Sequence, residues 1–393
     1  MSHWQSITVE RIHLHPVGME LAEKLRTSYG AEPFKSAVIV ELVTTDGVTG
    51  WGEAPTKMKP SYTYETVGTA LHVMGEFFAP ALTGQTIAAP TDVPGLLKRF
   101  RGHPVAKFAV EAAVWDAWAK TNNLTLAEAF AAHLPNPEQH TPKGYADVGV
   151  SIGIQESIEA TLEIIAKRLE QGYGRVKLKI EPGWDVELAR AVRKVYPDIS
   201  LMLDANSAYT LKDADHLKQL DDLNLLMLEQ PLGFDDIYEH GKLQPQLATP
   251  ICLDESIHSA NDTRLALEIG ACRIINLKPS RVGGFTESLK LYQVCVETGT
   301  PLWVGGMLET GVGRAANLAF ASLPGITLPS DISATDRYYA RDLTEPPFVL
   351  GDQSRIYVPT APGMGVEVVR ERLQDAENHW HANDPYQVRH AVQ

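Results

Sequence analysis

The chain has 393 residues, of which 44% are hydrophobic and 21% are charged, and its formal net charge is −14. This composition is typical of a folded globular protein, and the length allows one large domain together with a smaller one. The negative charge argues against nucleic acid and against membranes as partners, because nucleic acid and anionic lipid are bound by cationic surfaces.

The cysteines and the apolar segments indicate in which cellular compartment the protein is located. Cys252, Cys272 and Cys295 lack the spacing of metal ligands, so reduced thiols are expected. The first residues contain no apolar core of a signal peptide, and no stretch reaches the roughly 18 apolar residues of a membrane span. We therefore expect a cytoplasmic protein.

Residues 1–142 are predicted to form an α+β capping domain. Strands are predicted at residues 6–15 and 36–44, and helices at 64–79, 92–101 and 105–120. The second strand leads through Asp46-Gly47 into a further extended segment, which is a strong hairpin signal. The polar loops at residues 19–34 and 54–66 are expected to face a substrate.

From residue 143 to residue 333, strands and helices alternate. Strands are predicted at residues 147–152, 175–180, 200–205, 225–230, 250–255, 273–278, 301–305 and 326–330. Helices are predicted at residues 156–171, 184–196, 211–220, 235–247, 259–269, 284–298 and 311–321. Uninterrupted apolar strands between amphipathic helices favour a (β/α)7β barrel of the TIM type over a solenoid, because the strands share no repeat motif. Residues 334–393 are expected to return to the capping domain and to end in an exposed polar tail at residues 377–393.

Charged residues end five consecutive strands of this barrel at a near-constant interval. The steps from Lys179 to Asp204, to Glu229 and to Asp254 are 25 residues each, and Lys278 follows 24 residues later. A charge at the end of an apolar parallel strand is costly to bury unless it is paired or bound to a metal. In such barrels the active site lies at the carboxyl ends of the strands, so these side chains predict a site there.

Three of these residues are acids on successive strands. Asp204, Glu229 and Asp254 would converge as oxygen ligands, which suit a hard cation such as Mg²⁺ better than zinc. The alternative is that they cap helices or lie in solvent as loop acids. Their common register beside lysines favours the metal site.

The lysines suggest acid–base chemistry. Lys177 and Lys179 are two residues apart and so face the same side of a strand, here the barrel interior. Burial beside another ammonium and a divalent cation destabilises the charged form of Lys179, which favours the neutral amine that a base requires. Lys278 would approach a substrate from the opposite side. Ion pairs between these lysines and the acids are the purely structural alternative.

Together, these groups suggest removal of a proton next to a carboxylate, with Mg²⁺ stabilising the resulting enediolate. This arrangement resembles that of the enolase superfamily. The chain resembles the muconate-lactonising subgroup of that superfamily in the motifs Lys177-x-Lys179, Asp204-Ala-Asn206, Glu229-Gln-Pro231, Asp254-Glu255-Ser256 and Lys278-Pro-Ser-Arg-Val-Gly-Gly284. The resemblance covers nearly the whole chain, and residues 305–339 are most similar to the N-succinylamino acid racemase/o-succinylbenzoate synthase family.

The resemblance implies specific roles. Lys179 and Lys278 would be the acid–base pair with Lys177 beside them, and Asn206 and Glu255 would support the metal ligands. The implied substrate-binding residues are Thr27, Ser28, Tyr29, Tyr62, Ser151, Arg281, Gly305, Gly306 and Met307. The implied cofactor is Mg²⁺, for which Mn²⁺ or Co²⁺ can substitute, and we expect a homo-oligomer. One departure concerns the first loop, where residues 24–30 are KLRTSYG instead of the family's usual Pro-Phe-x-Thr-Ser-Phe-Gly.

The predicted activity is therefore N-succinylamino acid racemisation, o-succinylbenzoate synthesis by dehydration in a menaquinone pathway, or both, on a small carboxylate substrate. A dipeptide epimerase or muconate cycloisomerase of the same superfamily is the second possibility, although Glu309 is the only acid in the segment GGMLET. A Schiff-base aldolase would also use lysines in a barrel. A non-enzymatic scaffold would be expected to have lost part of the charged set.

Overall fold

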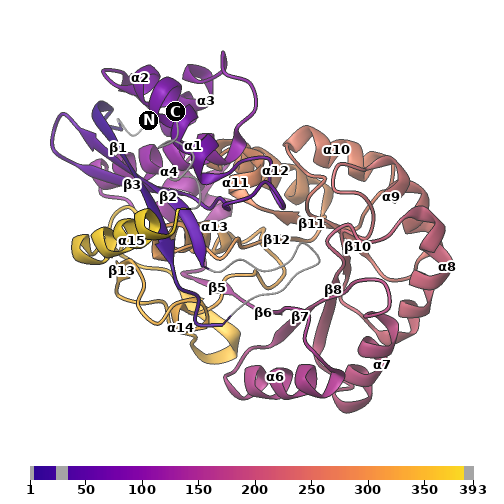
Figure 1. The fold of residues 1–393 in the computed structure, drawn as a ribbon. Coiled ribbons are helices and arrows are strands. Elements are labelled where there is room, and N and C mark those ends of the chain that lie inside the picture. The colour runs from indigo at the N-terminus through magenta and orange to yellow at the C-terminus, as the bar shows by residue number, and fades with distance from the viewer. Residues whose placement is uncertain (1–3, 24–33, 385–393) are drawn as a thin grey trace, which may run out of the picture.

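The structure is a computed structural model and describes residues 4–23 and 34–384 (Figure 1). It consists of an N-terminal sheet-and-helix part and a larger barrel whose helices lie on the outside of the parallel sheet (Figure 1). Within the described residues, no helix is both long enough and apolar enough to cross a membrane.

The N-terminal part begins with an antiparallel sheet, as predicted. Its strands in spatial order are β3 (Thr49–Ala54), β2 (Lys35–Thr44), β1 (Ile7–Met19) and β4 (Thr86–Ile87). The turn between β2 and β3 contains Gly47, whose φ of 79° lies in the left-handed region that glycine adopts without strain. The predicted hairpin is therefore present.

Helices and short helical turns complete the N-terminal part. They are α1 (Val67–Val73), the π-helical turn Met74–Phe78, α2 (Ala79–Leu82), the 3₁₀ turn Pro90–Asp92, α3 (Val93–Leu96), α4 (Pro104–Thr121), α5 (Leu126–Ala132) and the 3₁₀ turn Pro137–His140. Of these, α1, α2 and α4 contact the sheet. The helix α4 lies directly on β3: a Cβ atom at Gly52 would come within 2.0 Å of the backbone oxygen of Ala109. Glycine in β3 thus permits the sheet and the helix to approach closely.

The barrel sheet has seven hydrogen-bonded parallel strands. They are β6 (Val150–Ile152), β7 (Arg175–Lys179), β8 (Ser200–Asp204), β9 (Leu228–Glu229), β10 (Ile251–Leu253), β11 (Ile274–Leu277) and β12 (Leu302–Val304). The connecting helices are α6 (Ile158–Glu170), α7 (Val186–Val195), α8 (Ala214–Leu217), α9 (Tyr238–Leu243), α10 (Ala260–Glu268), α11 (Pro279–Val282), α12 (Phe285–Thr298) and α13 (Gly311–Ala321). The 3₁₀ turns Leu211–Asp213, Lys218–Leu223 and Gln244–Gln246 complete two regions that were predicted as single helices.

The segment 327–331 closes the barrel in place of a regular eighth strand. The amides of Thr327 and Asp331 donate to Leu302 and Val304 of β12. On the other side, Ser330 exchanges backbone hydrogen bonds with Asp147 and Gly149, just before β6. The predicted (β/α)7β barrel is thereby confirmed, with its last strand held by hydrogen bonds on both edges.

The C-terminal residues return to the N-terminal sheet. The elements are α14 (Thr335–Tyr338), β13 (Thr344–Glu345), the 3₁₀ turn Asp352–Ser354, β14 (Arg355–Tyr357), which pairs with β5 (Tyr145–Asp147), β15 (Glu367–Val368), which pairs with β13, and α15 (Arg370–Asn383). Residues 377–383, predicted as part of the exposed tail, form the end of α15, which packs on β1; Trp380 is buried there, whereas residues 381–383 are exposed as predicted. Leu373, Ala376 and Trp380, at helical spacing, are buried there between polar neighbours.

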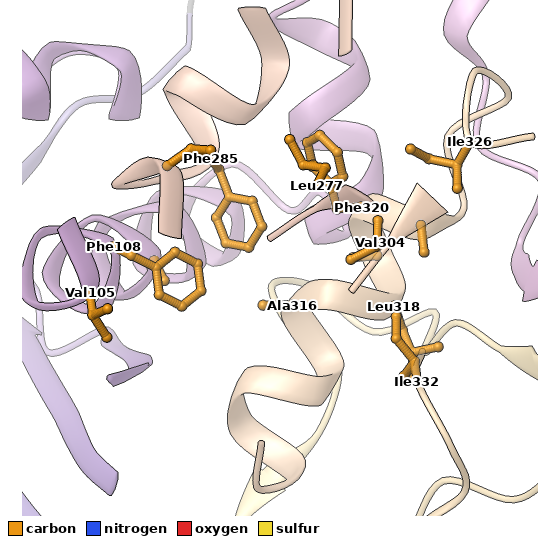
Figure 2. Packing of buried hydrophobic residues seen from close by; sticks show 14 of the residues in the cluster. Val105, Phe108, Leu277, Phe285, Val304, Ala316, Leu318, Phe320, Ile326 and Ile332 are labelled. Carbon is orange, nitrogen blue, oxygen red and sulfur yellow. The ribbon is translucent and has the colours of Figure 1, made fainter. Parts of the chain in front are cut away.

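Apolar side chains join the N-terminal helices to the barrel. Phe108 of α4 lies 5.3 Å from Phe285 of α12, measured between ring centroids (Figure 2). Phe285 also stacks 5.9 Å from Phe320 of α13. This continuous core fixes the N-terminal part against the barrel, so residues from both parts can be held at one site.

Candidate active site

The charged strand ends meet at one mouth of the barrel. Lys179 pairs in register with Asp204, and Asp204 with Glu229, across β7, β8 and β9. Asp254 and Lys278 come directly after β10 and β11. Asp204, Glu229 and Asp254 are at most 1% exposed. These five groups, of which the first and the last are 99 residues apart in the sequence, are therefore brought together, as the spacing predicts.

Two lysines contact the acids from the side of β7. The Nζ atom of Lys179 lies 2.5 Å from Oδ2 of Asp204. The Nζ atom of Lys177 lies 3.3 Å from the same oxygen and 3.2 Å from Oε2 of Glu229. Both lysines therefore face the barrel interior, as their two-residue spacing implies.

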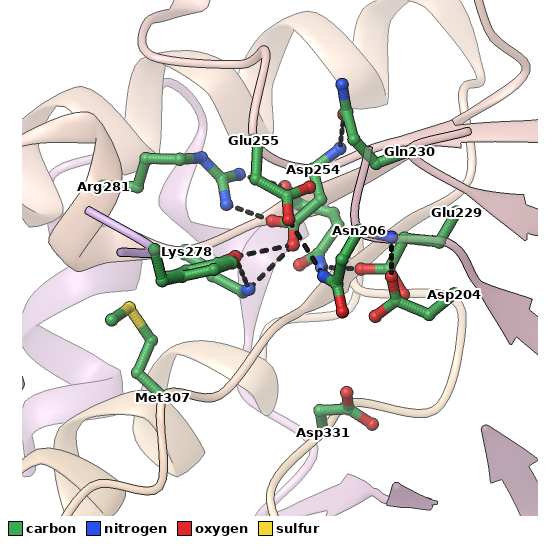
Figure 3. A network of polar contacts seen from close by, with 12 residues as sticks. Asp204, Asn206, Glu229, Gln230, Asp254, Glu255, Lys278, Arg281, Met307 and Asp331 are labelled. Atoms are coloured by element: carbon green, nitrogen blue, oxygen red, sulfur yellow. Dashed lines mark hydrogen bonds and ion pairs between the residues drawn. The ribbon is translucent and has the colours of Figure 1, made fainter. Parts of the chain in front are cut away.

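A second group of contacts surrounds Asp254 (Figure 3). The Nζ atom of Lys278 lies 2.8 Å from Oδ2 of Asp254, and Arg281 contacts Oδ1 of the same carboxylate. The hydroxyl of Tyr62, from the N-terminal part, donates to Oδ2 of Asp254 at 2.8 Å and accepts a hydrogen bond from Lys278. The N-terminal part thus contributes directly to the site.

One pocket of about 110 Å³ opens between these groups. It is lined by Lys57, Tyr62, Ser151, Lys177, Lys179, Asn206, Lys278, Gly306, Met307, Leu308, Asp331, Arg337 and Tyr338. Lys179 and Lys278 both line it, and three strands of the barrel, β8 to β10, lie between the strands that carry them. A carbon atom bound in this pocket would have one lysine on each side.

The remaining predicted residues have four different locations. Asn206 accepts from Lys179 at 2.7 Å and donates to Glu255 at 2.9 Å, so it links two members of the site. A Cβ atom on Gly305 would lie 2.6 Å from Cε of Lys278, so this glycine leaves room for the lysine rather than lining the pocket. Glu255 and Arg281 line a neighbouring cavity of about 290 Å³ instead. Residues 27–29 lie outside the described residues.

Burial and pairing set the charge states of the site. Burial opposes the charge of Lys177, but Asp331, Glu229 and Asp204 outweigh it and raise the pKa of this lysine well above its usual range. Burial likewise disfavours the charged form of Asp204, yet Lys179 and Lys177 lower the pKa of this carboxyl. Lys177 is therefore a permanent cation. Lys179 lies on the pocket wall, where it donates hydrogen bonds to Asp204 and Asn206.

The three acids have the chemistry of a site for a hard divalent cation. Burial, and then the charge of Asp204, raises the pKa of Glu229 well above its usual range, and Asp254 adds to the effect. The cluster would therefore be stabilised by additional positive charge, and carboxylate oxygens are the ligands that Mg²⁺ prefers. Among the described residues no three acid, His or Cys side chains form a ready metal site, and lysines and Arg281 hold the carboxylates instead. A divalent cation would compete with these side chains for the oxygens.

Two residues at the site, Asp331 and Arg337, were not predicted from the sequence. Asp331, at the end of the closing segment, contacts Lys177, lies 2.7 Å from Arg175 and accepts from Ser151 at 3.0 Å. Arg337 lines the pocket from α14. The repeat contained a signal for Asp331, which lies 53 residues after Lys278, about two further intervals along the chain.

The chain is similar to known proteins along most of its length. Residues 160–372 match the model of the enolase C-terminal domain-like family, and residues 10–130 match the mandelate racemase/muconate lactonizing enzyme N-terminal domain. An o-succinylbenzoate synthase from Geobacillus kaustophilus is 44% identical over 369 residues, which cover 94% of this chain and 96% of the relative. An N-succinylamino acid racemase from Amycolatopsis sp is 44% identical over 365 residues, covering 93% and 96%. A crystal structure of an enolase superfamily member from Listeria innocua superposes with a TM-score of 0.88 at 41% identity, covering 94% and 97%.

Proposed function

Because this chain belongs to the mandelate racemase/muconate lactonizing enzyme family of the enolase superfamily, we propose that it is an enzyme that removes the proton next to a substrate carboxylate. Its reaction is the racemisation of N-succinylamino acids, the dehydration that gives o-succinylbenzoate, or both. Relatives with each name are 44% identical over nearly the whole chain, which supports both reactions equally.

The observation that carries this proposal is the placement of Lys179 and Lys278 on opposite sides of one pocket. In racemisation, one neutral lysine takes the proton from the α-carbon, and the ammonium of the other returns a proton to the opposite face. Dehydration needs the first of these steps, after which the same lysine, now protonated, gives its proton to a neighbouring hydroxyl group, which leaves as water. One site can therefore support both reactions.

Enzymes of this superfamily use a divalent metal ion, generally Mg²⁺. We assign Asp204, Glu229 and Asp254 as its ligands in this chain. When bound, the ion would neutralise the negative charge that builds up on the substrate carboxylate as the proton leaves.

Other residues keep the acid–base pair in place. Lys177, with its raised pKa, remains charged and adds positive potential beside Lys179. Asn206 orients Lys179 through a 2.7 Å hydrogen bond, while Tyr62 contacts Lys278. We propose that residues 1–142 and 334–393 form the cap that closes this site over the barrel of residues 143–333.

Dipeptide epimerisation is less well supported. It would need an acid to bind the free ammonium of a dipeptide near the last barrel strands. Glu309 there accepts hydrogen bonds from the Met307 amide at 2.9 Å and from Asn317 at 3.0 Å. Asp331 is paired with Lys177 and Arg175. Among the described residues, both acids in this region are therefore already engaged, which favours an uncharged N-acyl group on the substrate.

A side-by-side assay tests the proposal. The purified protein, with Mg²⁺ added, is given the cyclohexadiene precursor of o-succinylbenzoate, a panel of N-succinylamino acids and a panel of dipeptides. We expect turnover of the precursor, of the N-succinylamino acids, or of both. Turnover of dipeptides alone would contradict the proposal.

A further inference from the structure

Arg337 is a buried cation on the pocket wall that the proposed chemistry does not use. Its side chain is 8% exposed. Its Nη2 atom donates to the backbone oxygen of Ser151 at 3.1 Å, and its Nη1 atom lies 3.3 Å from Glu23. The Nε atom is buried and has no hydrogen-bond partner among the described residues. The guanidinium therefore retains donors for a ligand.

The barrel order predicts which part of a substrate reaches Arg337. The three acids follow the third, fourth and fifth strands, β8 to β10, and the two lysines come from the second and the sixth. A substrate with its α-carboxylate at the acids and its α-carbon between the lysines must direct its remaining group toward the seventh strand, the closing segment and the first strand. Arg337, which touches Ser151 at the end of β6, lies on that side.

The charge on that side is positive. Asp331 is neutralised by Lys177 and Arg175 and so does not compete for Arg337. The carboxylate that does contact Arg337, Glu23, is shared with Arg168 and with Lys167 at 3.1 Å. Three cations thus surround one acid, whose side chain is 38% exposed. A second, buried carboxylate from a ligand would offset the excess positive charge of these three side chains.

We propose that Arg337 is a specificity-determining residue that binds the distal carboxylate of a dicarboxylic substrate. This inference rests on the proposed function and makes it more specific. The two relatives' names share a succinyl group, which carries such a carboxylate at the end opposite the reacting carbon. A guanidinium matches a carboxylate in geometry and can donate two parallel hydrogen bonds to it.

The first test uses the unaltered protein with Mg²⁺. It compares the best N-succinylamino acid of the panel with its N-succinamoyl analogue, in which a neutral amide of nearly the same shape replaces the distal carboxylate. We expect kcat/KM to be about 10- to 100-fold higher for the succinyl substrate, as for a charge-assisted hydrogen bond made in a buried site. Equal values for the two substrates would overturn the inference.

The second test assigns this preference to Arg337. Arg337→Gln should reduce the succinyl-to-succinamoyl ratio to near one, mainly through the succinyl KM, and Arg337→Lys should restore part of it. Lys167→Met is the matched control, because Lys167 also contacts Glu23 but does not line the pocket, and it should keep the ratio of the unaltered protein. An equal loss with both substrates in Arg337→Gln would indicate a structural role and overturn the inference.

The outcomes distinguish a failure of the proposed function from a failure of the role assigned to Arg337. If the unaltered protein turns over both N-acyl substrates equally well, the proposed function stands and the role of Arg337 is refuted. If it turns over neither of them, nor any other N-acylamino acid, nor the o-succinylbenzoate precursor, the proposed function fails and this inference falls with it. If Arg337→Gln does not fold, Arg337→Lys makes the assignment: a succinyl-to-succinamoyl ratio below that of the unaltered protein supports the role of Arg337, and an unchanged ratio overturns it.

Discussion

Glu53 links the N-terminal sheet to the barrel through hydrogen bonds, and its replacement by glutamine should change how the stability of the protein depends on pH. Glu53 is the penultimate residue of β3 and is fully buried. It accepts hydrogen bonds from the amide of Thr310 at 3.0 Å, the hydroxyl of Thr310 at 2.7 Å and the amide of Gly313 at 2.9 Å, all at the N-terminus of α13. Met307, on the pocket wall, lies three residues before this contact. The contact therefore ties the cap to the rim of the pocket.

The size of the effect follows from the pKa of Glu53. Burial raises the pKa from 4.5 to about 7; Lys35 partly offsets this increase and Glu309 adds to it. Between these two values the folded protein keeps a proton that the unfolded chain releases, so the stability contributed by this group is present below pH 4.5 and is lost as the pH rises toward 7. At about 1.4 kcal/mol per pH unit, the loss between pH 5 and pH 8 is about 2 to 3 kcal/mol.

Urea unfolding at pH 5 and pH 8 measures this contribution. Glutamine does not titrate and so escapes this loss. Between pH 5 and pH 8, the free energy of unfolding of Glu53→Gln should therefore rise by about 2 to 3 kcal/mol relative to that of the unaltered protein. Glu111, whose pKa burial also raises to about 7, contributes to both proteins and cancels. Glu10→Gln, at an exposed glutamate of β1, controls for the substitution itself. Parallel pH profiles of Glu53→Gln and the unaltered protein would refute the reasoning.

Removal of divalent metal by EDTA should abolish turnover and Mg²⁺ should restore it, whereas activity that survives exhaustive chelation would exclude the metal site. Asp204→Asn should fold normally but bind Mg²⁺ at least about 10- to 100-fold more weakly, because that is the loss seen even for residues that only hydrogen-bond to a metal ligand. Unchanged Mg²⁺ affinity in calorimetry would show that Asp204 is not a ligand. Gly305→Ala should lower kcat at least about 10-fold with the fold intact, because its Cβ would displace the side chain of Lys278, and an unchanged rate would contradict that packing. Borohydride with a carbonyl substrate should leave the mass of the protein unchanged, since a trapped adduct would indicate a Schiff-base aldolase instead.

The sequence predicted the barrel and most of its charged site because both follow from a repeat. Parallel strands with intervening helices place every strand end at the same mouth, so a 25-residue interval sufficed to group Lys179, Asp204, Glu229, Asp254 and Lys278. The same interval, continued, leads to Asp331. It was missed because the eighth strand was predicted to end at residue 330, one position too early.

Other contacts could not be predicted from local patterns. Glu53 and Thr310 are 257 residues apart, and nothing near either residue indicates that β3 would end at the N-terminus of α13. The second half of α15, from residue 377, was predicted as an exposed tail because its sequence is polar, although Trp380 is buried against the N-terminal part. Arg337 belongs to a four-residue helix outside the repeat. In each case the tertiary arrangement, not the local sequence, determines the role.

The central claim, that two lysines act on opposite faces of one carbon, is tested most directly by hydrogen exchange in D₂O. Each enantiomer of an N-succinylamino acid is incubated with Mg²⁺ and the unaltered protein, Lys179→Ala or Lys278→Ala, and deuterium at the α-carbon is followed by NMR. The unaltered protein should exchange both enantiomers, while each variant should lose exchange from one enantiomer, and the two variants should lose opposite ones. Normal exchange of both enantiomers by both variants would contradict the account.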